Sequence, residues 1–150
     1  MIASSVLDLV GDTPMVRLSR LAPRATILAK LEFTNPSGSL KDRIALRMLE
    51  GAERRGRLRR GMCVVEPTSG NTGAGLALAC AVKGYSMIAV LPEAMSHERV
   101  ALLKALGAKV VLTPCRSKQP GTFTCEDIDR TIETAQALAS KPRHLMLNQF

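Results

Sequence analysis

The order of the predicted secondary-structure elements between residues 62 and 148 constrains the fold more than any other feature. Short apolar runs predict four strands, at residues 62–66, 86–92, 109–113 and 144–148. Apolar residues at helical spacing predict helices between them, over residues 71–83, 97–106 and about 125–140. This alternation implies right-handed crossover connections. We therefore expect an α/β fold, a parallel four-stranded sheet with helices on both faces.

The first sixty residues follow a different pattern. Apolar runs at residues 15–18 and 26–32 predict two short strands, and a helix is predicted from Lys41 to Arg54. Because parallel sheets bind ligands outside the carboxyl ends of their strands, the loop after the strand ending at Glu66 is the first place to expect a site.

A lysine stands at the start of the predicted helix, in the sequence NPSGSLKDR of residues 35–43. The positive end of the helix dipole disfavours a cation there by up to about 1 kcal/mol. A neutral lysine amine is a nucleophile and can form a Schiff base with an aldehyde. Lys41 is therefore a candidate nucleophile. The alternative is an ordinary exposed lysine paired with Asp42 or Glu32.

The loop after Glu66 reads PTSGNTGAG, residues 67–75. Gly70 and Gly75 match the glycine spacing of a phosphate-binding P-loop, but Leu76 and Ala77 replace its lysine and hydroxyl residue. The dinucleotide-binding fingerprint also fails, because its third glycine is absent. A nucleotide site is therefore not expected.

A carboxylate suits this loop better than a nucleotide does. Backbone N–H groups at a helix start bind anions, and Thr68, Ser69, Asn71 and Thr72 add hydroxyl and amide partners. The alternative is a plain glycine-rich turn in which Ser69 or Asn71 caps the next helix.

Composition excludes several classes of function. The net charge of +8 includes the run RRGRLRR at residues 54–60, but aromatic residues make up only 3% of the chain. Stacking platforms for single strands are therefore missing, so we expect no nucleic-acid partner. No apolar run could span a bilayer, and the N-terminus is a poor signal peptide, so we expect a cytoplasmic protein. The four cysteines and two histidines lack zinc spacing, and no metal is predicted.

Several motifs occur together in one order. They are GDTPMVRL, NPSGSLKDR, VEPTSGNTGAGLALA, LPEAMSHERVALLKALGAKVVLTP and NQF. In these the chain resembles the N-terminal half of the cysteine synthase and cystathionine β-synthase family, pyridoxal-phosphate enzymes of fold type II. The resemblance covers nearly the whole chain and is weakest over residues 116–143.

The resemblance implies roles for individual residues. Lys41 corresponds to the Schiff-base lysine that binds pyridoxal 5'-phosphate and serves as the catalytic base. Asn71 corresponds to the asparagine that hydrogen-bonds the ring hydroxyl of the cofactor. The residues that correspond to the grip on the substrate's α-carboxylate are Thr68, Ser69, Gly70, Thr72 and Gln149.

The resemblance also implies an architecture. Residues 1–34 are expected to be strands that join a larger domain, and residues 35–150 to form the small α/β domain. The larger C-terminal domain, with the loop that binds the cofactor phosphate, is expected to be absent from these 150 residues. At full length we expect a homodimer.

The activity implied is β-replacement of the cysteine synthase type, in which O-acetylserine and sulfide give cysteine. We expect the 150 residues to be inactive alone. One alternative is the cystathionine β-synthase type, which joins serine and homocysteine. Another is a non-catalytic truncated form that binds weakly or pairs with a full-length subunit.

Overall fold

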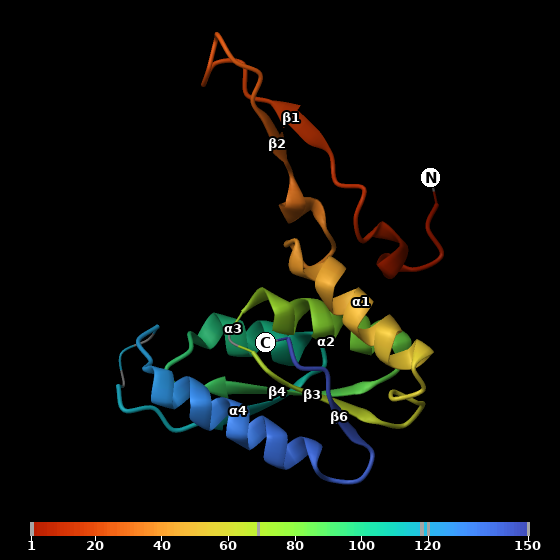
Figure 1. Cartoon of the computed structure of the whole chain (residues 1–150), viewed down its shortest axis with the longest axis vertical. Helices are drawn as coiled ribbons and strands as arrows, with labels where there is room; N and C mark the ends of the chain where they lie inside the picture. The colour runs from red at the N-terminus through yellow and green to blue at the C-terminus, as the bar shows by residue number, and fades with distance from the viewer. Residues whose placement is uncertain (1, 69, 118, 120, 150) are drawn as a thin grey trace.

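The computed structural model describes residues 2–68, 70–117, 119 and 121–149, and the chain folds as an α/β protein (Figure 1). Four parallel strands form a sheet of order β5-β4-β3-β6, and two further strands form an antiparallel pair. The strands are β1 (Met15–Arg17), β2 (Leu28–Lys30), β3 (Cys63–Pro67), β4 (Ser86–Pro92), β5 (Lys109–Thr113) and β6 (His144–Met146). The helices are α1 (Lys41–Arg54), α2 (Asn71–Lys83), α3 (His97–Ala105) and α4 (Cys125–Ala139), with the 3-10 helices η1 (Val6–Leu9) and η2 (Glu32–Thr34).

Helices cover both faces of the parallel sheet, as predicted. Val64 and Leu91 face the larger apolar core beneath α1, α2 and α3, whereas Val65 and Val90 pack against Ala135 of α4 on the other face. Figure 1 shows α4 alone on its side of the sheet. Because β3 and β4 are buried on both faces, their sequences are nearly continuous apolar runs.

Local signals set most helix boundaries where the sequence predicted them. Thr124 and Asp127 form a capping box at the start of α4, with Thr124 N–H donating to Asp127 Oδ2 over 2.9 Å. Gly84 ends α2 in the left-handed conformation, at φ +76°.

Helix α2 has a glycine where the start of α1 packs closely against it. Helix α2 is apolar on nearly every side because it contacts α1, α3 and the sheet. A Cβ atom on Gly75 would lie 3.1 Å from both Ala45 Cβ and Asp42 Oδ1 and 3.2 Å from the Lys41 carbonyl oxygen. Gly75 thus permits the two helices to meet next to Lys41.

Strands β1 and β2 project away from the rest of the molecule (Figure 1). Both are shorter than predicted. Strand β2 ends at Lys30 because the chain turns into η2 at Glu32, whose side chain binds Arg43 of α1. The pair exposes large apolar side chains: Met15 is 57% exposed, Leu28 51% and, just beyond it, Phe33 67%.

Candidate active site

The candidate residues gather at the carboxyl edge of the parallel sheet. The chain passes from β3 outward to β4 and β5, then returns to place β6 on the other side of β3. The order of strands therefore reverses beside β3, and ligands bind at such reversal points. The loop after β3 carries Thr68, Gly70 and the start of α2, and Gln149 follows β6 next to it.

Lys41 is the first residue of α1, as predicted. Ser39 Oγ accepts a hydrogen bond of 3.1 Å from the Lys41 N–H, which satisfies one free donor of the first turn. Asp42 is buried and accepts hydrogen bonds from the backbone and hydroxyl groups of Ser37. Glu32 is bound to Arg43. Both carboxylates that could have paired with Lys41 thus have other partners.

A polar network anchors the first turn of α1 to the N-terminal segment. Arg43 donates through Nε and Nη2 to the two oxygens of Glu32, over 2.9 and 3.0 Å. Thr13 Oγ1 donates to Glu32 Oε1 over 2.7 Å, and Asn35 Nδ2 donates to Oε2 over 3.0 Å. Asn35 Oδ1 in turn accepts from the Gly11 N–H over 2.9 Å. The network fixes the segment that leads to Lys41.

Protonation of the Glu32 carboxylate at low pH should break the hydrogen bonds of this network. Hydrogen bonds from Arg43 first, and then from Thr13, lower the pKa of Glu32 from 4.5 to about 2. Because the folded pKa is the lower one, the network contributes its full stability above about pH 4.5 and loses it as the pH falls through about 2. The check is an NMR titration of the Glu32 carboxyl carbon. A midpoint near 4.5 would contradict the network, and Arg43→Gln should move the midpoint back towards that value.

A cavity of about 580 Å³ adjoins Lys41. This volume lies within the range of about 300–1,000 Å³ usual for ligand pockets. Two of the residues that line the cavity, Lys41 and Arg99, are cationic, which suits an anionic ligand. The other lining residues are Gly70, Asn71, Met95, Ser96, Gly121 and Phe123.

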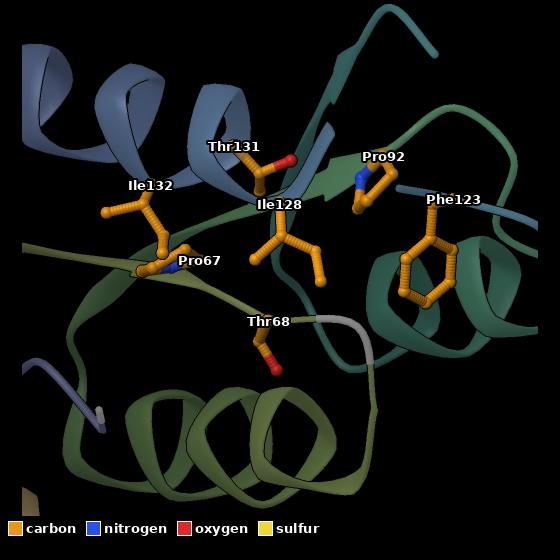
Figure 2. A pocket seen from close by; sticks show the side chains of 7 residues that line it. All are labelled: Pro67, Thr68, Pro92, Phe123, Ile128, Thr131 and Ile132. Atoms are coloured by element: carbon orange, nitrogen blue, oxygen red, sulfur yellow. The ribbon is translucent and has the colours of Figure 1, made fainter. Parts of the chain in front are cut away.

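Thr68 has a buried hydroxyl group that finds no hydrogen-bond partner among the described residues. Its side chain lies between α2 and a second, mainly apolar pocket of about 130 Å³, which is drawn in Figure 2. A Cβ atom on Gly73 would lie 2.7 Å from Thr68 Cγ2, so only glycine there lets the loop fold this closely over α2. A buried hydroxyl group without a partner is costly, and a ligand bound at this edge is one explanation for it.

For helix α2, the sequence allows a side-chain cap from Ser69 or Asn71 as one alternative, and Ser69 is not among the described residues. The N-cap of α2 is Gly70, and no side-chain cap hydrogen bond is present there among the described residues. Asn71 is the first helical residue and Thr72 is buried behind it. The free N–H groups of such a helix start are suited to an anion.

The structure brings the predicted residues to one edge but not into one cavity. Lys41, Gly70 and Asn71 line the larger cavity, and Thr68 lines the pocket beside it. Phe123 lines both, and so forms a shared wall. Ser69 lies outside the described residues. The Gln149 side chain donates through Nε2 to the Pro67 carbonyl over 2.7 Å.

Sequence reasoning missed several residues of the site. Met95 and Arg99 follow β4, and Phe123 follows β5. Ligands bind outside the carboxyl ends of parallel strands, and this holds for β4 and β5 as it does for β3. The segments that follow β4 and β5 were therefore predictable parts of the site. Glu66, for which the sequence predicts only the end of a strand, also belongs to this edge, because its carboxylate accepts hydrogen bonds from the N–H groups of residues 147–149.

Other possible sites gain no support from the part of the chain that is described. No group of three or more potential metal ligands occurs there, and no helix is long and apolar enough to cross a membrane. The four cysteines are free thiols, and burial raises the pKa of Cys80 to about 12. Cys80 is therefore a packing residue of the core.

Comparisons with known proteins identify relatives of one kind. Residues 6–150 match the family model described as pyridoxal-phosphate dependent enzyme. The chain is 54% identical over 124 residues to a protein of Bacillus subtilis named "Probable cysteine synthase", which covers 81% of this chain and 40% of that protein. It is equally 54% identical over 121 residues to the cystathionine beta-synthase of Oryctolagus cuniculus, covering 78% of this chain and 22% of that protein.

A solved structure has the same fold. It is described as a hydrogen sulfide-producing enzyme from Fusobacterium nucleatum, and the two chains superpose with a TM-score of 0.86 at 39% sequence identity. The match covers 99% of this chain and 46% of the other. The chain thus spans less than half the length of these relatives.

Proposed function

Because this chain belongs to the family of pyridoxal-phosphate-dependent enzymes, we propose that it forms the part of a β-replacing enzyme that carries the catalytic lysine, Lys41. One observation carries the proposal. Lys41, Gly70 and Asn71, which come from two different helix starts, line a single cavity at the carboxyl edge of the sheet. A β-replacing enzyme of this family would need a lysine, an amide side chain and free backbone N–H groups together in one site.

The residues at this edge fit the family's cofactor. The cavity has the volume of a small-molecule site and two cationic lining residues, and the cofactor is anionic. Lys41 Nζ would hold it covalently, and the Asn71 side chain would hydrogen-bond its ring hydroxyl. When bound, pyridoxal phosphate supplies an electron sink that stabilises negative charge on the α-carbon of an amino acid.

The chain's own residues would then bind the substrate and move one proton. The buried Thr68 hydroxyl group has no hydrogen-bond partner among the described residues, and it could donate to a substrate carboxylate. Ser69, Gly70, Thr72 and Gln149 would complete the grip on that carboxylate. Lys41 Nζ would take up the proton of the substrate's α-carbon, in the manner of a general base.

Cysteine synthase-type chemistry, from O-acetylserine and sulfide, is the activity we propose. The bacterial relative named as a probable cysteine synthase supports it, since it aligns with 81% of this chain. A cystathionine β-synthase-type reaction of serine with homocysteine is the second candidate, because the mammalian relatives of that name reach the same 54% identity.

We further propose that residues 1–34 join a larger domain in a protein of the relatives' length, while residues 35–150 form the small domain. The exposed apolar side chains on β1 and β2 support this arrangement, because a two-stranded ribbon is marginally stable by itself.

Thr68→Val tests the proposed function. Removing an unpartnered buried hydroxyl should raise the free energy of unfolding by about 1 kcal/mol. If the hydroxyl binds the substrate carboxylate, the same change should weaken L-serine binding by about 1.5–3 kcal/mol. Chemical denaturation and an NMR titration with L-serine measure the two effects.

The matched control is Thr131→Val in the same pocket (Figure 2). The Thr131 hydroxyl is satisfied, since it donates to the Asp127 carbonyl over 2.8 Å and lies 2.8 Å from Thr113 Oγ1. This variant should lose stability and keep L-serine binding. Unchanged L-serine binding in Thr68→Val would count against the carboxylate site.

A further inference from the structure

Glu66 is a fully buried carboxylate at the end of β3, with an exposure of 0%. It accepts three hydrogen bonds from consecutive backbone N–H groups beyond β6. Leu147 and Asn148 donate to Oε2 over 3.2 and 3.0 Å, and Gln149 donates to Oε1 over 2.7 Å. These partners lie more than eighty residues away in the sequence, so the contact joins two distant segments.

The backbone beyond β6 is shaped around this carboxylate. Asn148 has a positive φ of +62°, which turns the chain so that successive N–H groups converge. Such a concavity of backbone N–H groups binds anions, and here the anion is a side chain of the same protein. The Gln149 side chain makes a second link to the same place, through its bond to the Pro67 carbonyl.

The ladder between β3 and β6 does not account for this contact. In that ladder, Cys63, Val64 and Val65 of β3 pair with the three residues of β6, and β6 ends at Met146. Residues 147–149 are thus held by the carboxylate after the ladder has ended. Burial of a carboxylate is unfavourable and raises the pKa of Glu66, while the three N–H groups oppose that rise. A glutamate that served only to fill the core would be replaceable by an apolar side chain.

We propose that Glu66 is a positioning residue: it holds Gln149 in register with the Thr68 loop, so that both can act on one substrate carboxylate. The inference rests on the proposed function, because Thr68 and Gln149 are the carboxylate-binding residues in that proposal. Glu66 itself would touch no substrate. Its effect would pass through the two links that join β3 to residues 147–149.

Glu66→Gln is the direct test, and Asp127→Asn is its control. The amide keeps the size of the side chain but leaves one oxygen for three N–H donors. Asp127 is also a fully buried carboxylate with backbone N–H partners, but it caps α4 away from Gln149. Amide hydrogen exchange at residues 147–149 should become at least about tenfold faster in Glu66→Gln and stay unchanged in Asp127→Asn. Unchanged exchange in a folded Glu66→Gln protein would overturn the proposal.

A second measurement needs no variant. In the unmodified chain, an NMR coupling across the hydrogen bond between the Gln149 N–H and the Glu66 carboxyl carbon should be observable. If Glu66→Gln fails to fold, the absence of this coupling, with residues 147–149 unprotected from exchange, would overturn the proposal instead.

A binding arm separates this inference from the proposed function. L-serine should shift the Gly70, Asn71 and Gln149 resonances, and Glu66→Gln should weaken that binding about tenfold, as expected for a displaced binding group. Asp127→Asn should bind L-serine like the unmodified chain. Failure of L-serine to bind the unmodified chain would contradict the proposed function. The exchange data would still show whether the Glu66 carboxylate holds residues 147–149 in place. Equal L-serine binding with and without the Glu66 carboxylate would contradict the positioning role.

Discussion

Replacing Lys41 by alanine is expected to abolish covalent attachment of pyridoxal phosphate to this chain. Lys41 lines the cavity that also contains Asn71 and the start of α2, and it occupies the first position of α1. Alanine is a good helix former, so the free energy of unfolding should change by less than about 0.5 kcal/mol. The measurement is the visible absorbance of bound cofactor, recorded at a limiting concentration of pyridoxal phosphate so that exposed lysines are not labelled, with thermal unfolding alongside.

Lys109→Ala is the control for this result. Lys109 is an exposed lysine at the opposite end of the sheet, where β5 begins. It should keep the absorbance of the unmodified chain. The assignment of Lys41 would be wrong if the Lys41→Ala protein retained the same band, since another lysine would then carry the cofactor.

The second large effect concerns the 150 residues tested by themselves, which should not form cysteine at a measurable rate. The resemblance places the loop that holds the cofactor phosphate outside the matched residues, which span 40% of the bacterial relative. A phosphate dianion is usually held by several charge-assisted hydrogen bonds of about 1.5–3 kcal/mol each. Three such bonds are worth about 5 kcal/mol or more, which corresponds to over a thousandfold in affinity.

The assay adds pyridoxal phosphate, O-acetylserine and sulfide to the purified chain and follows cysteine. A separate titration measures cofactor affinity. Steady cysteine production with tightly held cofactor would show that residues 1–150 suffice, and the proposed need for a larger domain would be refuted.

Most of the parallel-sheet domain was predictable because its signals are local. The predicted bounds of α1, α2 and β5 coincide with those of the structure, since glycine stops and apolar periodicity are both read within a few residues. The end of β6 was predicted two residues late. Its apolar pattern continues past Met146, but the N–H groups there bind Glu66, a partner that the local pattern cannot reveal.

The candidate site was predictable where its residues stand in a local sequence pattern, and not where tertiary structure alone brings them together. The loop at Thr68 stood out because a strand leads through small polar residues into a helix. Phe123 lies in the loop between β5 and α4, which has no periodic pattern, and only the fold brings it to the cavity of Lys41. The network of Thr13, Glu32 and Arg43 likewise joins residues up to 30 positions apart. Such contacts depend on tertiary structure rather than on spacing.

The central claim is that the cavity beside Lys41 is the cofactor site, and reductive trapping tests it most directly. The unmodified chain is incubated with a limiting amount of pyridoxal phosphate, reduced with borohydride, digested and mapped by mass spectrometry. We predict one pyridoxyl group, carried by the peptide that contains Lys41. A label spread over exposed lysines such as Lys104 and Lys109, with no preference for Lys41, would contradict the claim.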